Sequence, residues 1–173
     1  MMHRRASMYL LLVVMAGVFF NHVSLRHKDN GYLLVIDERE LDIIGLAHER
    51  WVRLRRNCEG VSSLGAESPQ HERVKQLIQA YSPPSSASAQ ITSLVSTQAW
   101  ALAEVEFKEL LPAVVLIKFS EGEPSIVPHA IWSGYTNPWR AAPHIRAYMA
   151  TQAPQAPAEL LDCFEPRSKA FSQ

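Results

Sequence analysis

Four β-rich runs in the second half of the chain limit its fold more than any other feature. Each is bounded by turn residues and has the length of an ordinary strand. The runs are 91–96, 99–107, 113–120 and 125–132. The third run is almost wholly apolar, which predicts a central strand, whereas Pro124 and Pro128 predict an edge or a bulge for the fourth. Alternation in the second run predicts that Glu104 and Glu106 share a face that is at least partly wet.

The segment before these runs has the pattern of an amphipathic helix. Apolar residues recur at helical spacing from Leu41 to Cys58. Asp37 is the predicted N-cap, with Glu40 three residues later in a capping-box arrangement. We therefore expect a helix over residues 38–57.

Three further helices are expected where a serine or a proline can open a turn. Ser68 and Pro69 predict the start of a second helix, because serine caps helices and proline suits the first helical position. Pro143 and Pro157 predict short helical segments near the C-terminus. Two helices, a four-stranded antiparallel curved sheet and a short helical C-terminal segment together make an α+β fold.

An apolar stretch near the N-terminus, residues 8–20, follows Arg4 and Arg5. As a helix it covers only about 20 Å, short of the roughly 30 Å hydrocarbon core, so a membrane span needs an extension to Leu25. An uncleaved signal anchor over residues 8–25, a cleaved secretory signal and a buried soluble helix are the alternatives. The first two predict that the body of the protein leaves the cytoplasm, and the two arginines favour a cytoplasmic N-terminus.

The composition fits one globular domain behind this segment. Of 173 residues, 47% are apolar and 20% are charged, as in ordinary globular chains. We expect an N-terminal membrane helix within residues 1–30 and a single extracytoplasmic domain over residues 31–173, periplasmic if the source is a Gram-negative bacterium. Seventeen basic and seventeen acidic residues give no net charge, so no nucleic-acid partner is expected.

The runs WALAEVEF, AVVLIKF and SIVPHAIW, placed after two helices, carry a resemblance to a known fold. In this order of elements, the chain resembles the NTF2-like or cystatin-like superfamily over about residues 38–135. The resemblance implies helices packed into a curved sheet. Membrane-anchored members of that fold class include assembly factors of conjugation and type IV secretion machines, so it also implies a possible role in an envelope complex, although a fold does not dictate function.

Cys58 and Cys163 are the only cysteines in the chain. In an oxidising compartment an isolated pair predicts a disulfide, and two buried free thiols are the alternative. The seven histidines form no HxxxH or HExxH pair, and no cysteine or histidine spacing suggests zinc. We expect no metal site and no cofactor.

A short segment with three large aromatic residues is the best candidate for a binding site. Residues 132–139 read WSGYTNPW, and an arginine follows. Aromatic residues beside an arginine are typical of interface hot spots and of ligand clefts. The alternative is a structural role, in which the two tryptophans cover the open end of the sheet. The candidate binding residues are Trp132, Tyr135, Trp139, Arg140 and His129.

Catalytic patterns are weak in this sequence. Ser133 lies in WSGYT rather than in GxSxG, so it gives no nucleophile elbow. Glu104 and Glu106 could act as paired carboxylates, but no partner residue supports that role. The basic residues within 50–56 fit either a solvated helix face or a partner-binding patch. We name no catalytic residue.

We therefore expect a membrane-anchored extracytoplasmic module that joins protein partners in an envelope complex and contacts the membrane through residues 8–25. One alternative is a small ligand-binding protein or enzyme that uses a sheet cavity lined by Trp132, Tyr135 and Trp139. Another is an inhibitor or immunity-type binder. An enclosed polar cavity with converging His or Asp side chains would favour the ligand-binding alternative, and a filled core with an exposed aromatic patch would favour the other two.

Overall fold

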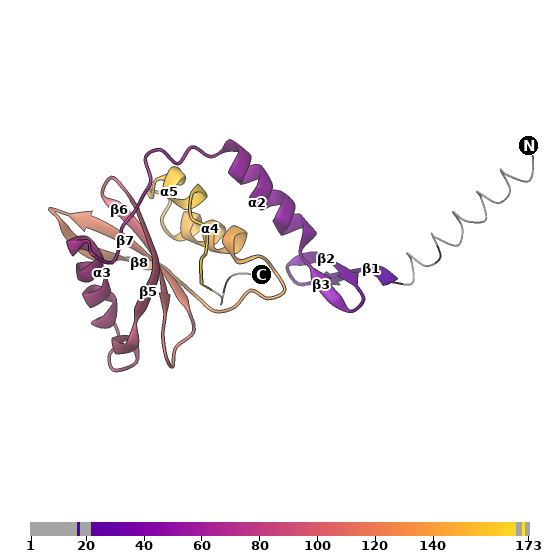
Figure 1. Ribbon diagram of the computed structural model, residues 1–173, viewed down its shortest axis with the longest axis horizontal. Helices are drawn as coiled ribbons and strands as arrows, with labels where there is room; N and C mark the ends of the chain where they lie inside the picture. Colours follow the sequence, from indigo (N-terminus) through magenta and orange to yellow (C-terminus); the bar gives the residue numbers. More distant parts are fainter. Residues whose placement is uncertain (1–16, 18–21, 169–170, 172–173) are drawn as a thin grey trace, which may run out of the picture. The chain divides into compact units, whose positions relative to one another are not determined.

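The computed structural model of the protein describes Gly17, residues 22–168 and Phe171. It contains two compact units, one that ends at Ala47 and one that begins at His48, and each is described by itself. Within the described residues there are two antiparallel sheets, of three and five strands, and four α-helices (Figure 1). The fold is thus α+β, with one sheet more than the sequence predicts.

The first unit is a three-stranded antiparallel sheet. Its strands are β1 (Val23–Lys28), β2 (Gly31–Ile36) and β3 (Arg39–Leu41), in that order. Glu40 on β3 accepts hydrogen bonds from Arg26 at 2.8 Å and from Lys28 at 2.7 Å, both on β1. The hydrogen bond from Lys28 lowers the pKa of Glu40, and the Arg26 bond acts in the same direction. Ion pairs therefore link the two outer strands across β2.

The predicted N-terminal membrane helix is wrong where the structure describes it. Residues 23–25 lie in β1 and pair with residues 34–36 of β2. The chain turns back before Gly31, whose φ of 125° suits a hairpin turn. No helix among the described residues is both long enough and apolar enough to cross a membrane. The apolar run 8–20 lies outside the described residues, apart from Gly17.

The first helix begins later than predicted. Asp37 and Glu38 have φ values of 46° and 68°, so they form the two-residue turn between β2 and β3 instead of capping a helix. Helix α2 spans Ile43–Arg55. Asp42 takes the capping role, because its Oδ1 accepts a hydrogen bond from the Gly45 backbone N–H at 2.7 Å.

The second unit is built on a five-stranded antiparallel sheet with the strands in sequence order. They are β4 (Ser62–Ser63), β5 (Gln90–Thr97), β6 (Trp100–Glu106), β7 (Ala113–Ser120) and β8 (Glu123–Ser133). All four predicted strands are present, but the prediction of a single four-stranded sheet is wrong. The additional strand, β4, has only two residues, too few to show a periodic pattern, and is held by pairing with Ser96 and Val95.

Helices cover both faces of this sheet (Figure 1). Helix α3 (Pro69–Gln79) lies on one face, and helices α4 (Ala141–Gln152) and α5 (Ala158–Asp162) lie on the other. Ser68 caps α3 as predicted, since its side chain accepts the Gln70 N–H. A 3-10 turn, η1 (Ser85–Ser88), leads from α3 into β5.

The central strands β6 and β7 are buried on both faces. Toward α3, the core contains Val74, Ile78, Ala101, Ala103, Val105 and Val115. Toward α4 and α5, it contains Leu102, Val114, Leu116, Ile145, Met149, Leu160 and Phe164. Apolar side chains therefore fill both faces of the sheet along its central strands.

Strand β8 is an edge strand, as Pro124 and Pro128 predict. Its pairing with β7 shifts register between Val115 and Ile117, and His129 has a φ of 63° at this irregularity. A bulge of this kind bends an edge strand locally.

Glu104 is the clearest departure from the expected wet sheet face. Its side chain has no exposed area, and its carboxylate accepts hydrogen bonds from the backbone N–H groups of Arg167, at 2.9 Å, and Ser168, at 2.8 Å. The hydroxyl of Ser168 also donates to Glu106. The C-terminal segment covers this face, and the two glutamates anchor it.

Burial raises the pKa of Glu104, and the charge of Glu106 acts in the same direction, while the two backbone N–H groups oppose the rise. The folded state therefore keeps this proton to a higher pH than the unfolded chain does, and wild-type stability is lost as the pH rises from about 4.5 through the folded pKa. Glu104→Gln cannot ionise and should not show this loss. The unfolding free energy of Glu104→Gln minus that of the wild type should therefore increase between pH 4 and pH 8.

Urea unfolding at several pH values tests this, with Glu104→Ala as the matched control. The alanine variant leaves two backbone donors without their acceptor, which should cost about 1–3 kcal/mol. A gap between wild type and Glu104→Gln that does not change with pH would contradict the raised pKa.

Candidate functional site

The structure separates the two tryptophans of the 132–139 segment from its tyrosine. Trp139 is only 8% exposed, and Trp132 is half-buried with its ring 5.3 Å from that of Phe171. Tyr135 is 64% exposed. The burial of the two tryptophans therefore fits a structural role. The exposed tyrosine is the aromatic residue of this segment that can reach a partner.

The turn that holds these aromatics is fixed by local hydrogen bonds. The backbone N–H of Trp139 donates to the Thr136 carbonyl at 2.7 Å, and the Thr136 hydroxyl donates to the Trp139 carbonyl at 2.8 Å. The ring of His144 meets that of Trp139 edge to face, with centroids 6.4 Å apart. His129 lies in β8, where its carbonyl accepts a hydrogen bond from the Tyr148 hydroxyl at 2.8 Å.

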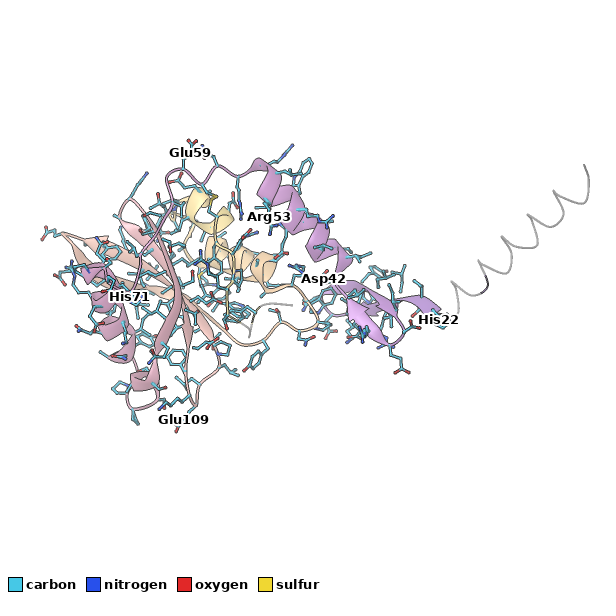
Figure 2. The ribbon with its side chains drawn as sticks, in the orientation of Figure 1. His22, Asp42, Arg53, Glu59, His71 and Glu109 are labelled. Atoms are coloured by element: carbon cyan, nitrogen blue, oxygen red, sulfur yellow. A yellow bond between two sulfur atoms is a disulfide. The ribbon has the colours of Figure 1, made fainter. Side chains whose placement is uncertain are left out.

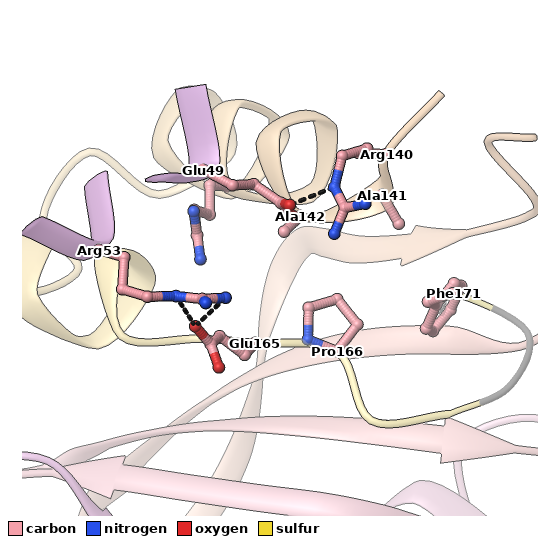
Figure 3. Close-up of a pocket in the computed structure, with 9 residues that line it drawn as sticks. Glu49, Arg53, Arg140, Ala141, Ala142, Glu165, Pro166 and Phe171 are labelled. Atoms are coloured by element: carbon pink, nitrogen blue, oxygen red, sulfur yellow. Dashed lines mark hydrogen bonds and ion pairs between the residues drawn. The ribbon is translucent and has the colours of Figure 1, made fainter. Parts of the chain in front are cut away.

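A charged pocket of about 160 Å³ lies where α2, α4 and the segment after α5 meet within the second unit (Figure 3). The charged residues that line it are Glu49, Arg53, Arg140, Arg146 and Glu165. The rest of the lining is small or apolar, from the start of α4 and from the C-terminal segment. Of the predicted candidates, Arg140 belongs to this pocket.

Two ion-pair groups form the rim of the pocket (Figure 3). Arg140 donates to Glu49, and Glu165 pairs with Arg53 at 3.1 Å and with Arg56 at 2.7 Å. Partial burial acts to raise the pKa of Glu165, but the hydrogen bond and charge of Arg56, together with Arg53, outweigh it and lower that pKa. Glu165 is therefore held as a carboxylate between two guanidinium groups.

Arg146 is the most deeply placed cation of the pocket. It is 8% exposed, and one terminal nitrogen donates to the Phe164 carbonyl at 2.6 Å. Its Nε is buried and has no hydrogen-bond partner among the residues that the structure describes. Burial lowers the pKa of Arg146, whereas the charge of Glu49 raises it. Unlike Arg140, Arg53 and Arg56, Arg146 makes no ion pair within 4.0 Å in the described part of the chain.

A disulfide ties two walls of the charged pocket together. Cys58 and Cys163 are bonded, with Cα atoms 5.8 Å apart and a sequence separation of 105. Cys58 follows Arg56 by two residues, and Cys163 precedes Glu165 by two. The covalent bond therefore holds the segments that carry the Arg56–Glu165 ion pair next to each other.

From His48 on, α2 belongs to the second unit, where it turns its polar side toward the rest of that unit and its apolar side outward. Glu49, Arg53 and Arg56 recur at helical spacing and make the ion pairs described above. On the other side, Trp51 and Leu54 are exposed, Leu54 by 82%. The Arg55 guanidinium lies over the Trp51 ring, 4.0 Å from its centroid. Figure 2 marks Arg53 on α2.

An apolar groove of about 310 Å³ lies at the end of α3, beside β7 and β8. Its apolar lining includes Ile78, Tyr81, Phe107, Leu110, Leu111 and Ile131. Two serine hydroxyls in the lining are used within the fold, since Ser86 donates to the Gln79 carbonyl and Ser133 to the Pro112 carbonyl. This groove is suited to apolar groups and does not contain Trp132, Tyr135 or Trp139 among its described lining residues.

Sequence reasoning missed Glu49, Arg146 and Glu165. Arg146 was detectable in principle, because it lies on the apolar side of α4, next to Ile145 and three residues before Met149. The basic residues within 50–56 do not act together as a solvated helix face or as a partner-binding patch, because Arg53 and Arg56 form ion pairs with Glu165.

Comparison with protein-family models, with curated proteins and with solved structures finds no match to this chain. The resemblance to the NTF2-like superfamily therefore stays a prediction that rests on the order of elements.

Proposed function

We propose that this protein is a non-catalytic interaction module of the cell envelope that docks a protein partner on the outward side of α2. One observation carries the proposal: α2 binds its own domain through charged side chains and leaves its apolar side exposed. Surface helices of globular proteins ordinarily show the reverse arrangement. Exposed apolar patches on soluble domains mark sites of interaction.

The composition of this surface fits a protein interface. Trp51 and Leu54 lie one turn apart on the part of α2 that belongs to the second unit. Tryptophan and arginine are the residue types most enriched among interface hot spots. We refer to Trp51 and Leu54 as the α2 stripe.

Charge indicates the kind of partner that fits the α2 stripe. Arg50 and Arg55 are exposed beside it, and Arg55 stacks on Trp51. A complementary surface therefore has an apolar groove with aspartate or glutamate on its rim, which would pair with both arginines. Helix-in-groove recognition uses apolar anchors one helical turn apart, as Trp51 and Leu54 are.

The disulfide supports a location outside the cytoplasm. Disulfides persist in oxidising compartments and are rare in cytosolic proteins, where thiols are kept reduced. The apolar run that follows Arg4 and Arg5 supports delivery to the membrane or across it. We therefore propose that the module acts on the extracytoplasmic side of the membrane.

Photo-crosslinking in the producing cell tests this function. With benzoylphenylalanine in place of Leu54, we expect a discrete cross-linked protein that presents an acidic-rimmed apolar groove. The same label at Gln152, an exposed position at the end of α4, is the matched control. Binding of the purified partner should weaken by about 30-fold or more in Trp51→Ala, the change that corresponds to a hot spot of about 2 kcal/mol.

Two further measurements make the outcome decisive. Arg50→Glu and Arg55→Glu should each weaken binding and reduce its dependence on salt, since both charges border the stripe. Trp51→Ala should unfold at the wild-type midpoint, because its ring is exposed. Equal cross-linking from positions 54 and 152, or binding that Trp51→Ala leaves unchanged, would refute the role of α2.

A further inference from the structure

We infer that the charged pocket is a binding site for the carboxylate of a small aliphatic acid. The inference is independent of the role proposed for α2, because the pocket lies on the polar side of that helix. It rests on three features of the pocket: an excess of guanidinium groups, an open helix N-terminus, and a volume matched to a small molecule.

The first feature is the charge of the lining. Three arginines and two glutamates line the pocket, and each glutamate is already engaged by an arginine. Within the described part of the chain, Arg146 has no carboxylate partner within 4.0 Å and its Nε has no hydrogen-bond partner, although the residue is more than nine-tenths buried. A buried guanidinium without an ion pair is costly, and a bound carboxylate would offset that cost.

The second feature is the start of α4, whose first two residues, Ala141 and Ala142, also line the pocket. Arg140 at the N-cap position makes no side-chain capping bond to a described residue, and no acidic residue lies in the first turn. The first backbone N–H groups of a helix have no intrahelical acceptor, and the helix dipole is positive at this end. Pro143 supplies no N–H, so Ala141 and Ala142 are the donors that an anion can use.

The third feature is size and polarity. A volume of about 160 Å³ is close to the roughly 150 Å³ of a protein cavity that holds one benzene molecule. That matches an acid of three or four carbons better than a nucleotide or a sugar phosphate. Pro166 and Phe171 line the same pocket and give the aliphatic part of such an acid an apolar contact.

Titration of the disulfide-bonded protein with propionate, followed by NMR of its backbone amides, tests the inference. We expect saturable shifts of the Ala141 and Ala142 amides, and no such shifts with propionamide, which has nearly the same shape but no charge. Arg146→Met should weaken propionate binding at least tenfold, and Arg53→Gln, at the more exposed edge, should weaken it several-fold.

Arg73→Gln is the matched control, since Arg73 bonds to the Gly122 carbonyl on another part of the domain. It should leave propionate binding unchanged. If Arg146→Met does not fold, Arg53→Gln still decides the question, because Arg53 is largely exposed. Equal shifts from propionamide, from chloride at the same ionic strength, or stronger binding of inorganic phosphate would each overturn the assignment to a carboxylate.

Discussion

The double variant Cys58→Ser/Cys163→Ser is expected to lose about 2–5 kcal/mol of unfolding free energy. The bond closes a loop of 105 residues, so its removal restores a large amount of freedom to the unfolded chain. In the folded state, the end of α2 would then be held to the segment after α5 chiefly by the ion pairs of Glu165. Guanidinium unfolding of the oxidised wild type and the double variant measures the loss.

Two controls separate the bond from the side chains. Reduced wild-type protein should unfold at the same midpoint as the double variant, because both lack the covalent link. Ser62→Ala, an exposed change in β4, should stay within about 0.5 kcal/mol of the wild type. A double variant as stable as the oxidised wild type would show that the bond adds nothing to the fold.

Trp139→Ala should cost about 3–5 kcal/mol of folding stability, whereas Tyr135→Ala should cost less than about 1 kcal/mol. The physical reason is burial: the Trp139 ring is enclosed and packs on His144, and the Tyr135 ring is mostly in solvent. Thermal and urea unfolding of the two variants measure the difference. The segment then divides into a structural anchor and a surface side chain.

Trp139→Phe is the control for the anchor, because it keeps an aromatic ring in the site and should recover a large part of the loss. For Tyr135, the outcome that would contradict the prediction is a large loss of stability. A large loss in Tyr135→Ala, comparable to that in Trp139→Ala, would remove Tyr135 from the candidate binding residues.

Elements with a strong local pattern were predictable from the sequence. Strand β7, Ala113–Ser120, has the predicted bounds, because a short apolar run rich in β-branched residues is typical of a buried strand. Ser68 caps α3 as its position before Pro69 predicts. These predictions depend on neighbours in the sequence and need no knowledge of tertiary contacts.

The first sheet was not predicted, because two local signals competed. Asp37 and Glu40 match a capping box, yet Asp37 and Glu38 adopt positive φ angles and form a hairpin turn. The turn brings Glu40 onto β3, where it meets Arg26 and Lys28 of β1. Pairing between β1, β2 and β3 determines the structure of this region, and that pairing cannot be deduced from a single sequence.

The charged pocket was predictable only through Arg140. Its other charged members come from distant segments, so that Glu49 on α2 meets Arg140 before α4, and Glu165 follows α5. Glu104 is likewise expected on a wet face from its strand pattern alone, because that pattern does not reveal that the C-terminal segment covers this side of the sheet. In both cases the missing information is long-range contact.

The irregular edge strand β8 limits how copies of this protein can associate. An exposed regular strand offers a row of backbone donors and acceptors to any other strand, and such edges lead to amyloid-like stacking. In β8, Pro124 and Pro128 have no N–H to offer, and the bulge at His129 interrupts the row between them and the strand end. Growth of the sheet from this edge is therefore disfavoured, and concentrated solutions of the protein should show little aggregation along β8.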